Sequence, residues 1–535
     1  MRLSFFVAVP LLAAACGSDP VETGGGGSGG ENVGATAPGG AGGAGGAGPE
    51  LCKPTGGGPF WLEEGESVTV TFTCETGALL DGADLTVEGL PANATYDAAS
   101  ASVTFTPGLD QASVYLWRAT LGATGEVGLV KVGVADKFDD PANVPVTDPS
   151  AYTEEYGLPV LFLSPAPTSE TYAPATTVYR GHTYSMQAKL RGAASLNYPK
   201  NSFTLEFDKA DKFDEPFEAD GFNGRRKVVL ISTFDDNSYV RQRLAYDLWD
   251  RLDPAHIQIK TYSAVIYVDG VYFGLYTVSD HVDGFLMEDH GYSQDGNLYK
   301  AVNHDANFAL TSIQNGGAPK ATLHDGYEKR EGTPLDGEPG AYADLEELVN
   351  FVATSDSTTF LSELPQRIDQ RDFQDWFVFV TYLLADDSAG KNSYLYHDPQ
   401  DPNGVFRYAP WDFNHSFGQT WQTFREGASA YEDYAGNNRL FARFLEEPSL
   451  TAPLEARYSA ALKGAFSADA VNALVDSYVA RITPSAHRDE RRWEAEYRAF
   501  PWWSSRTDFN DFEGEVAYLK AWIEERWQFQ SALYP

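Results

Sequence analysis

The chain has 535 residues, of which 76 are acidic and 39 are Lys or Arg, so its formal net charge is −37. Nucleic acid and anionic lipid surfaces would repel such a chain, and the charge therefore excludes non-specific binding to either. An acidic surface is also ordinary in soluble secreted proteins, so it identifies no particular partner. The length leaves room for one small and one large domain behind an N-terminal leader.

Residues 1–16 have the pattern of an export signal. Arg2 is followed by an apolar run and by three alanines that end at Cys16. The run is much shorter than the roughly 20 residues that a helix needs to cross a bilayer. Small residues that end at a cysteine are similar to a bacterial lipobox, in which the cysteine is lipidated. We therefore expect a lipoprotein-type signal peptide, and a protein that is exported and either secreted or held on an outer or cell-surface membrane through Cys16 alone.

Residues 17–58 are rich in Gly, Ala and Ser and poor in bulky apolar side chains. Such a composition cannot bury a core, so we predict a flexible tether. Cys52 and Cys74 are the two cysteines that remain after Cys16. In an exported chain this pair favours a disulfide over a metal site.

Residues 59–140 contain short runs of alternating apolar and polar residues, separated by turn residues. The runs are SVTVTFTC, DLTVEGL, SVTFTPG, SVYLWRATLG and GLVKVGVAD. Several short alternating strands at this spacing predict a small β-sandwich domain of immunoglobulin-like type. None of these runs contains residues that suggest catalysis, so we expect a spacer or an interaction module.

From about residue 145 the pattern changes to longer helices mixed with strands. The segments 341–356 and 514–533 place apolar residues at helical spacing, and both predict amphipathic helices. Two β-rich runs between residues 263 and 278 flank Asp269 and Gly270, a dipeptide that strongly favours a tight hairpin. The second region is therefore predicted to be an α+β domain with a core of its own.

One group of polar residues has the spacing of a phosphoryl-transfer site. Protein kinases place Asp-x-x-x-x-Asn on a loop and Asp-Phe-Gly after a short hairpin, because transfer needs a carboxylate for the hydroxyl and oxygen ligands for Mg²⁺. Asp387 and Asn392 have the same offset, SYLYHDP and GVFRYAP predict the hairpin, and Asp412 follows it before Phe413.

The same residues also have a purely structural interpretation. Asp386 and Asp387 could cap a turn after the helix that ends in TYLLA, and Asp412 could cap the next element. The His-Arg that normally precedes the catalytic Asp is absent, because Ala385 and Asp386 stand there. Asp386 competes with Asp387 for the catalytic position, and we assign that position to Asp387.

Other familiar catalytic patterns are absent from the sequence. It contains no Gly-x-x-x-x-Gly-Lys-Ser/Thr loop, no His-Glu-x-x-His and no Gly-x-Ser-x-Gly. The nine histidines are scattered, which argues against a zinc site. The stretch DPQDPNG has oxygen ligands without the full calcium-loop pattern, so a plain turn is the better interpretation.

Five blocks of the second region carry a family resemblance. They are KLRGAASLNYPKNSFTLEF, VIYVDGVYFGLYTVSDHVDGFL, GNLYKA, DDSAGKNSYLYHDP and APWDFNHSFG. In order and style they resemble the CotH (spore coat H) kinase family, which has a secreted and highly divergent form of the protein-kinase fold. The resemblance implies that residues 145–535 form a divergent protein-kinase-like domain behind the small β-sandwich.

The resemblance also implies an activity and its cofactors. It suggests an exported atypical protein kinase that uses ATP with Mg²⁺ or Mn²⁺ and phosphorylates Ser or Thr hydroxyls of secreted or surface proteins, its own chain included. Asp387 would be the base or orienting carboxylate, and Asn392 and Asp412 would bind the metal ion.

The nucleotide would be held by the first part of the same domain. Arg191 and Lys200 would contact the phosphates, since LRG and PKNSFTLEF predict adjacent strands. Backbone groups around Asp280 and His281 would pair with adenine. Lys300 lies in one of the shared blocks, but the resemblance gives it no role. The family's paired lysines appear here as Lys200 and an asparagine, and its usual Glu appears as Asp280.

A function of another class fits the same sequence. In that alternative the protein is a surface-tethered binding or structural protein, its kinase-like fold has lost its chemistry, and the β-sandwich carries out recognition. The presence of Asp387, Asn392 and Asp412 together favours the kinase, because a scaffold needs none of the three.

Overall fold

The computed structural model describes residues 52–219 and 221–535. The predicted signal peptide, the lipid anchor at Cys16 and the tether as far as residue 51 lie outside the described residues. Folded structure starts before the predicted end of the tether, because Cys52 is bonded to Cys74 and β1 (Pro54–Thr55) pairs with β4 (Thr73–Cys74). The predicted disulfide is confirmed. Every helix in the described ranges is too short or too polar to cross a bilayer.

The first folded region consists of two small sheets that share one core. The four-stranded sheet has the order β2 (Phe60–Glu63), β9 (Val127–Ala135), β8 (Ser113–Leu121) and β5 (Leu85–Glu88). The three-stranded sheet has the order β3 (Val68–Thr71), β7 (Ser102–Phe105) and β6 (Ala94–Asp97). Alternate residues of both sheets, among them Val103, Phe105 and Trp117, are buried against one another. SVTVTFTC, predicted as one strand, is split between β3 and β4.

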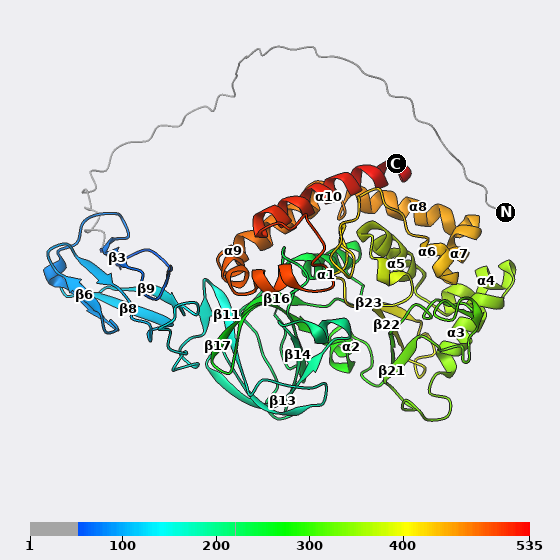
Figure 1. Cartoon of the computed structure of the whole chain (residues 1–535), viewed down its shortest axis with the longest axis horizontal. Coiled ribbons are helices and arrows are strands. Elements are labelled where there is room, and N and C mark those ends of the chain that lie inside the picture. The colour runs from blue at the N-terminus through cyan, green and yellow to red at the C-terminus, as the bar shows by residue number, and fades with distance from the viewer. Residues whose placement is uncertain (1–51, 220) are drawn as a thin grey trace, which may run out of the picture. The chain divides into compact units, whose positions relative to one another are not determined.

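A closed barrel of seven strands follows, where the family resemblance had implied the nucleotide-binding part of a kinase (Figure 1). Its strands are, in order around the barrel, β11 (Leu158–Ser164), β12 (Ala173–Tyr179), β13 (His182–Arg191), β14 (Ser202–Phe207), β15 (Lys227–Ile231), β17 (Val271–Asp280) and β16 (Thr261–Val268). All neighbours are antiparallel except β11 and β16, whose parallel pairing closes the barrel. The short strand β10 (Glu154–Glu155) extends β11.

The barrel is formed from locally predictable hairpins. Asp269 and Gly270, with φ values of 51° and 80°, turn β16 into β17 as their sequence predicts. Arg191 pairs with Ser202 across β13 and β14, which confirms that these two segments are adjacent strands. The interior of the barrel is filled by inward-facing residues such as Leu205, Leu230 and Tyr276.

The remainder is a four-stranded antiparallel sheet surrounded by helices. The sheet has the order β21 (Tyr327–Glu331), β18 (Asn297–Ala301), β22 (Ser393–His397) and β23 (Arg407–Pro410). The strands β22 and β23 are the predicted hairpin. A separate pair, β19 (Thr311–Ser312) and β20 (Ala318–Pro319), lies in the connection after β18.

The helices of the described ranges fall into two groups. Shorter ones are α1 (Arg241–Leu252), α2 (Gly284–Asp289), α3 (Ala343–Thr354), α4 (Ser357–Glu363), α6 (Tyr434–Asn437) and α7 (Arg439–Glu446). Longer ones are α5 (Gln370–Leu383), α8 (Pro448–Lys463), α9 (Ala468–Ala499) and α10 (Phe512–Leu533). The helices α3 and α10 correspond to the two predicted amphipathic helices. The fold is therefore mixed α+β, as predicted.

Candidate functional site

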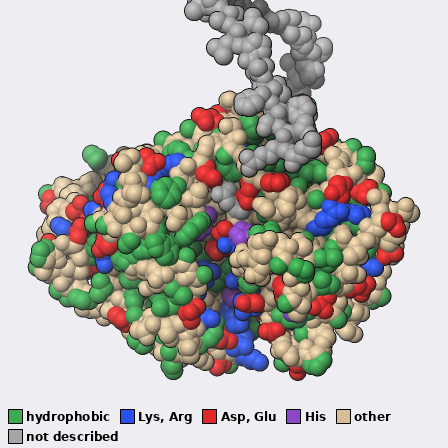
Figure 2. Space-filling model, turned by 45° about the vertical axis from the view of Figure 1, so that its right-hand side comes forward, with side chains coloured by type: hydrophobic (Ala, Val, Ile, Leu, Met, Phe, Trp, Pro, Cys, Tyr) green, Lys and Arg blue, Asp and Glu red, His purple; other side chains and the backbone are tan. Residues whose placement is uncertain are grey.

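A cleft of about 660 Å³ lies beside strands β13, β14 and β15 of the barrel and reaches the four-stranded sheet. Four of its lining residues are acidic: Glu170, Glu328, Glu331 and Asp412. Six are basic: Lys189, Arg191, Lys227, Lys300, Arg330 and Lys391. The lining is thus net positive in a chain whose net charge is −37. Figure 2 shows basic side chains gathered in a groove down the middle of one face.

Three of these cations form no ion pair with any residue that the structure describes. Among the residues that the structure describes, no ion pair or hydrogen bond engages the charged groups of Arg191, Lys227 or Lys300. Arg191 and Lys300 instead lie over the ring of Trp411, at 5.2 and 5.8 Å from its centre. Burial, followed by the charge of Arg191, lowers the pKa of Lys300 to about 8. The charges of Asp412 and Glu328 offset this lowering only in part, so a bound anion would stabilise these neighbouring cations further.

The loop after α5 carries Asp387 to the edge of this cleft. Helix α5 ends at Leu383, and the next residue, Leu384, has a φ of 51° that leads the chain toward a short 3-10 turn over Asp386–Ala389. The Asp387 carboxylate lies 2.9 Å from the ammonium of Lys391, which lines the cleft, and 3.7 Å from the imidazole of His304. The carboxylate therefore faces cationic and polar groups and is not buried in a core.

Asn392 and Asp412 lie together at the base of the β22–β23 hairpin. The side-chain amide of Asn392 donates a hydrogen bond of 3.3 Å to the backbone carbonyl of Asp412, and the amide of Trp411 donates to the carbonyl of Asn392. Both residues have left-handed backbones, with φ values of 60° and 65°. Asn and Asp tolerate this conformation better than most residues, and such positions cluster at functional sites.

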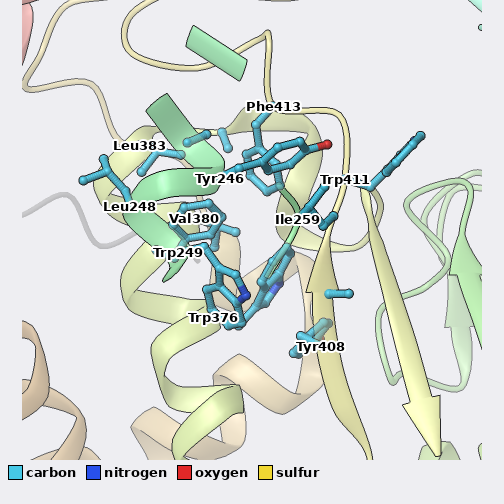
Figure 3. Packing of buried hydrophobic residues seen from close by; sticks show 14 of the residues in the cluster. Tyr246, Leu248, Trp249, Ile259, Trp376, Val380, Leu383, Tyr408, Trp411 and Phe413 are labelled. Carbon is cyan, nitrogen blue, oxygen red and sulfur yellow. The ribbon is translucent and has the colours of Figure 1, made fainter. Parts of the chain in front are cut away.

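Two side chains of helix α1 hold the backbone at Asp412 and Phe413 in place. The hydroxyl of Tyr246 accepts a hydrogen bond of 3.2 Å from the Asp412 amide, and Gln242 accepts one of 3.1 Å from the amide of Phe413. Figure 3 shows Phe413 packed beside Tyr246 in the buried cluster, whereas Trp411 points away from it. The rings on either side of Asp412 thus leave its carboxylate at the surface of the cleft.

The oxygen atoms of Asn392 and Asp412 suit a magnesium ion. No described residue donates a hydrogen bond or forms an ion pair with the Asp412 carboxylate, and the Asn392 oxygen is equally free of protein partners. Within the described ranges, no group of three or more His, Cys, Asp or Glu could hold a metal. A cation bound here would therefore need phosphate oxygens and water as further ligands, which is the usual way that Mg²⁺ binds.

A buried carboxylate that the sequence did not suggest supports the loop after Asp412. Asp235 accepts hydrogen bonds from Asn414 at 2.5 Å and from Tyr198 at 3.3 Å, and it pairs with His415 at 2.8 Å. Burial lowers the pKa of His415, but the bond to Asp235 and the charges of Asp235, Asp412 and Asp387 outweigh it and raise that pKa. The carboxylates of Asp387 and Asp412 are therefore both close enough to influence one imidazole.

Lys200 lies elsewhere, contrary to the sequence-based expectation. Its side chain is fully buried, its ammonium pairs with Asp489 of α9 at 2.7 Å, and it donates a hydrogen bond of 2.8 Å to the carbonyl of Leu275. It does not line the cleft. The side chain is already satisfied inside the protein, so the geometry gives it a structural role between the barrel and α9.

Asp280 is also turned away from the cleft. Its carboxylate is buried and makes a bidentate pair with Arg225, and burial raises its pKa to about 6. The backbone amide of Asp280 donates to Lys260, and the amide of His281 donates to the Asp280 side chain. Both amides that were expected to face adenine are therefore already bonded. The His281 side chain itself does line the cleft.

The structure thus unites four of the six predicted site residues and separates two. Arg191, Asn392 and Asp412 line one cleft, and Asp387 contacts its rim through Lys391. One signal for a further cation was present in the sequence, because Lys189 and Arg191 are two apart on a predicted strand and so share a face. The contributions of Lys227, Arg330 and Asp235 depend on pairing between distant segments, so no local pattern predicts them.

These features define an α+β protein in which a net positive cleft adjoins a set of Asp and Asn oxygens. Residues 188–530, more than half of the chain, match the family described as CotH kinase protein, and the chain belongs to that family. It is also similar to the inner spore coat protein H of Bacillus subtilis (strain 168). The two are 24% identical over 339 residues, which is 63% of this chain and 84% of that protein.

Proposed function

We propose that the protein is an exported atypical protein kinase that transfers the γ-phosphate of ATP, with Mg²⁺ or Mn²⁺, to Ser or Thr hydroxyls of secreted or surface proteins. The observation that carries this proposal is the cleft, where Arg191, Lys227 and Lys300 have no anionic partner among the described residues and adjoin Asn392 and Asp412. Family membership supports the same reaction class. The name of the Bacillus subtilis relative places that relative in a spore coat, which agrees with an exported or surface location.

The residues of the cleft have separate tasks in this reaction. Arg191 and Lys300 hold the β- and γ-phosphate oxygens and offset their charge. Asn392 and Asp412 hold Mg²⁺, which supplies charge neutralisation at the phosphates when it is bound. Lys300, rather than Lys200, takes the role of the phosphate-binding lysine in this assignment.

Asp387 acts on the protein substrate. Its carboxylate accepts the proton of the attacking hydroxyl as the new oxygen–phosphorus bond forms and the bond to the β–γ bridging oxygen breaks, so that ADP leaves. Lys391, 2.9 Å away, keeps the carboxylate oriented. The nearby His304 is held neutral, because burial and then the charge of Lys391 lower its pKa.

Calorimetry of ATP binding tests the nucleotide site. Wild-type protein should bind ATP more tightly with Mg²⁺ than without it, and the double variant Arg191→Gln/Lys300→Gln should weaken binding by about a hundredfold, since each charge-assisted contact contributes roughly 1.5–3 kcal/mol. The exposed Lys209 lies outside the cleft, so Lys209→Gln is the matched control. Equal affinities for all three proteins would contradict the assignment of the cleft.

A surface-tethered binding or structural protein with an inactive kinase-like fold is the second candidate. It is favoured by one observation, the burial of Lys200 against Asp489 away from the cleft. The two candidates differ in a single outcome. Only the kinase predicts transfer of the γ-phosphate to protein, whereas the binding protein predicts at most nucleotide binding.

A further inference from the structure

Helix α10 fastens the segment of residues 413–430, which follows Asp412 in the chain. The α10 residues in contact with it are Glu515, Tyr518, Trp522 and Arg526. They are spaced by three or four positions and therefore form one face of the helix. In protein kinases the equivalent stretch, behind the metal-binding Asp, has to be ordered before substrate can be phosphorylated.

Three of these side chains hold the backbone of the 413–430 segment. Each donates a hydrogen bond to one or more of its carbonyl groups, so the contacts do not depend on which side chains the segment carries. The bonds are Tyr518 to Gly418 (2.9 Å), Trp522 to Glu426 (2.9 Å), and Arg526 to Ala428 (2.8 Å) and Ala430 (2.9 Å).

Close packing at Gly418 shows that the segment is fitted to the helix. Gly418 has a φ of 76°, and a Cβ atom there would lie 2.4 Å from the indole of Trp522 and 2.7 Å from the hydroxyl of Tyr518. A residue with a side chain would therefore both strain the backbone and collide with α10. The glycine allows the segment to touch the helix directly.

Glu515 adds a buried charge to this contact. Its carboxylate lies between two arginines, at 2.6 Å from Arg425 of the segment and 2.6 Å from Arg241 of α1. Burial alone would raise the pKa of Glu515, but Arg241 and Arg425 lower it to about 2, so the carboxylate stays ionised. The guanidinium of Arg425 also lies over the ring of Tyr518, at 3.8 Å from its centre.

The same network leads back to the candidate site. Arg241 binds Asp236 at 2.5 Å, and the neighbouring Asp235 holds Asn414 and His415 beside Asp412. A change at Glu515 would therefore reach Asn414 and His415, which follow Asp412 in the chain, through a short series of ion pairs, hydrogen bonds and adjacent residues.

We propose that α10 is a permanent clamp that orders the 413–430 segment for phosphoryl transfer, with Glu515 as its central positioning residue. Many protein kinases order this segment by phosphorylating it, and the added phosphate then binds arginines. Here a fixed carboxylate already occupies such a place on Arg425. This protein would therefore need no phosphorylation of the segment to be active, an inference that rests on the proposed kinase function.

Hydrogen–deuterium exchange of the full-length protein without ATP tests the clamp independently of any activity. In Glu515→Gln, amides of the 413–430 segment should exchange about tenfold faster or more than in the wild type, while those of β13 and β14 should not change. Lys520→Gln is the matched control, because Lys520 lies on another face of α10 and pairs with the exposed Asp476 of α9. Unchanged exchange of the segment in Glu515→Gln would overturn the proposal.

A milder variant covers the case in which Glu515→Gln unfolds. Tyr518→Phe removes only the hydroxyl that bonds to Gly418 and leaves the ring under Arg425. It should also speed exchange of the segment, and no change there would equally overturn the clamp.

Enzyme kinetics of Arg425 variants then distinguish a positioning role of the segment from a general loss of structure. Arg425→Gln should raise KM for a protein substrate and lower kcat while the affinity for ATP with Mg²⁺ is kept, and Arg425→Lys should recover part of the loss. Wild-type protein treated with a phosphatase should keep its activity, and loss of activity after that treatment would contradict the permanent clamp. A wild type without any transfer would refute the proposed function, whereas the exchange result would still decide the clamp.

Discussion

Lys300 is a cleft residue whose ionisation depends on its surroundings. Burial and then the charge of Arg191 lower its pKa to about 8, although Asp412 and Glu328 act in the opposite direction. A bound phosphate favours the protonated lysine and would raise this pKa. The pKa of Lys300 should therefore change when an anion binds in the cleft.

The first prediction follows from this coupling. Since phosphate binds the protonated form, affinity for ATP with Mg²⁺ should fall above about pH 8, by up to about tenfold for each pH unit. Another titrating group of the cleft, Glu331, has a pKa that burial raises to about 7, so it changes the affinity at lower pH. Lys300→Arg should bind without this fall, because arginine keeps its charge over the whole range. Calorimetry between pH 6.5 and 9.5 on the full-length protein checks both, and identical pH profiles for the two would refute the role of Lys300.

Asp412 supports a second prediction at the same scale. Asp412→Asn keeps a residue that tolerates the left-handed backbone, with its φ of 65°, and removes only the negative charge. We expect it to abolish the Mg²⁺-dependent part of ATP binding while the midpoint of urea unfolding changes little. The exposed Asp295 provides the control variant Asp295→Asn. A variant at Asp412 that still binds ATP more tightly with Mg²⁺ would exclude it as a ligand.

Among single residues, those close together in sequence were the predictable ones. Asn392 and Asp412 belong to the two ends of one hairpin, so their meeting follows from local pairing. Lys200 could not be placed in the same way, because its partner Asp489 lies on a helix almost at the other end of the chain. A lysine next to strand residues has the same local pattern whether it faces a nucleotide or an internal carboxylate.

At the scale of elements, helix α9 connects the barrel to the helical part of the domain through buried polar contacts. The Asp489 carboxylate forms an ion pair with the ammonium of Lys200 and accepts a hydrogen bond of 2.7 Å from the backbone amide of Leu275. The indole of Trp493 donates a hydrogen bond of 2.8 Å to the backbone carbonyl of Phe273. Burial lowers the pKa of Lys200 and raises that of Asp489, so both charges depend on each other inside the protein.

The third prediction concerns this pair. Lys200→Met should lower the free energy of unfolding by about 3–5 kcal/mol, because it leaves Asp489 as an uncompensated buried charge. The affinity for ATP should stay within twofold of the wild type, measured under conditions where the variant is folded. Lys209→Met, on an exposed lysine, should change stability by less than about 0.5 kcal/mol. A stable Lys200→Met protein with weak ATP binding would restore the phosphate role first expected of Lys200.

Hairpins and amphipathic helices were predictable at this scale, but closure of the barrel was not. The Asp269-Gly270 turn and α10 each follow from a short stretch of sequence. The barrel closes through the parallel pairing of Val160 with Val265, which brings together strands with several others between them. No alternation of apolar residues specifies which distant strand will be the partner, so a kinase-like sheet and a barrel give the same local pattern.

At the scale of the whole molecule, the β-sandwich region is bound to the rest through buried charges. Arg488 of α9 pairs with Glu155 at 2.8 Å and with Glu63 of β2, and it donates to the carbonyl of Asp136 at 2.7 Å. Phe138 stacks on Tyr272 of the barrel at 4.3 Å. These contacts pack the region against the barrel and α9, and its role as a spacer or an interaction module stays a prediction.

The fourth prediction is that these contacts make the two regions unfold together. Urea unfolding of residues 52–535 should show one cooperative transition for wild type, with tryptophan fluorescence and circular dichroism coinciding. Arg488→Met should separate the transitions and destabilise the protein by about 3 kcal/mol or more, since it leaves the buried Glu155 carboxylate without its arginine. Arg491→Gln, on an exposed arginine that also contacts Glu63, should cost at most about 1 kcal/mol. Two separate transitions in the wild type would show that the regions are independent.

Transfer of labelled γ-phosphate from ATP to protein distinguishes an active kinase from a binding protein in one assay. Full-length protein with Mg²⁺ or Mn²⁺, alone and with a generic protein substrate, should incorporate label on Ser or Thr. Asp387→Asn should bind ATP normally and incorporate none, Asp412→Asn should also incorporate none, and Asp386→Asn and Asp295→Asn should behave as wild type. Loss in Asp386→Asn alone would shift the catalytic position by one residue. No label in the wild type, in spite of metal-dependent ATP binding, would contradict the kinase and favour the binding protein.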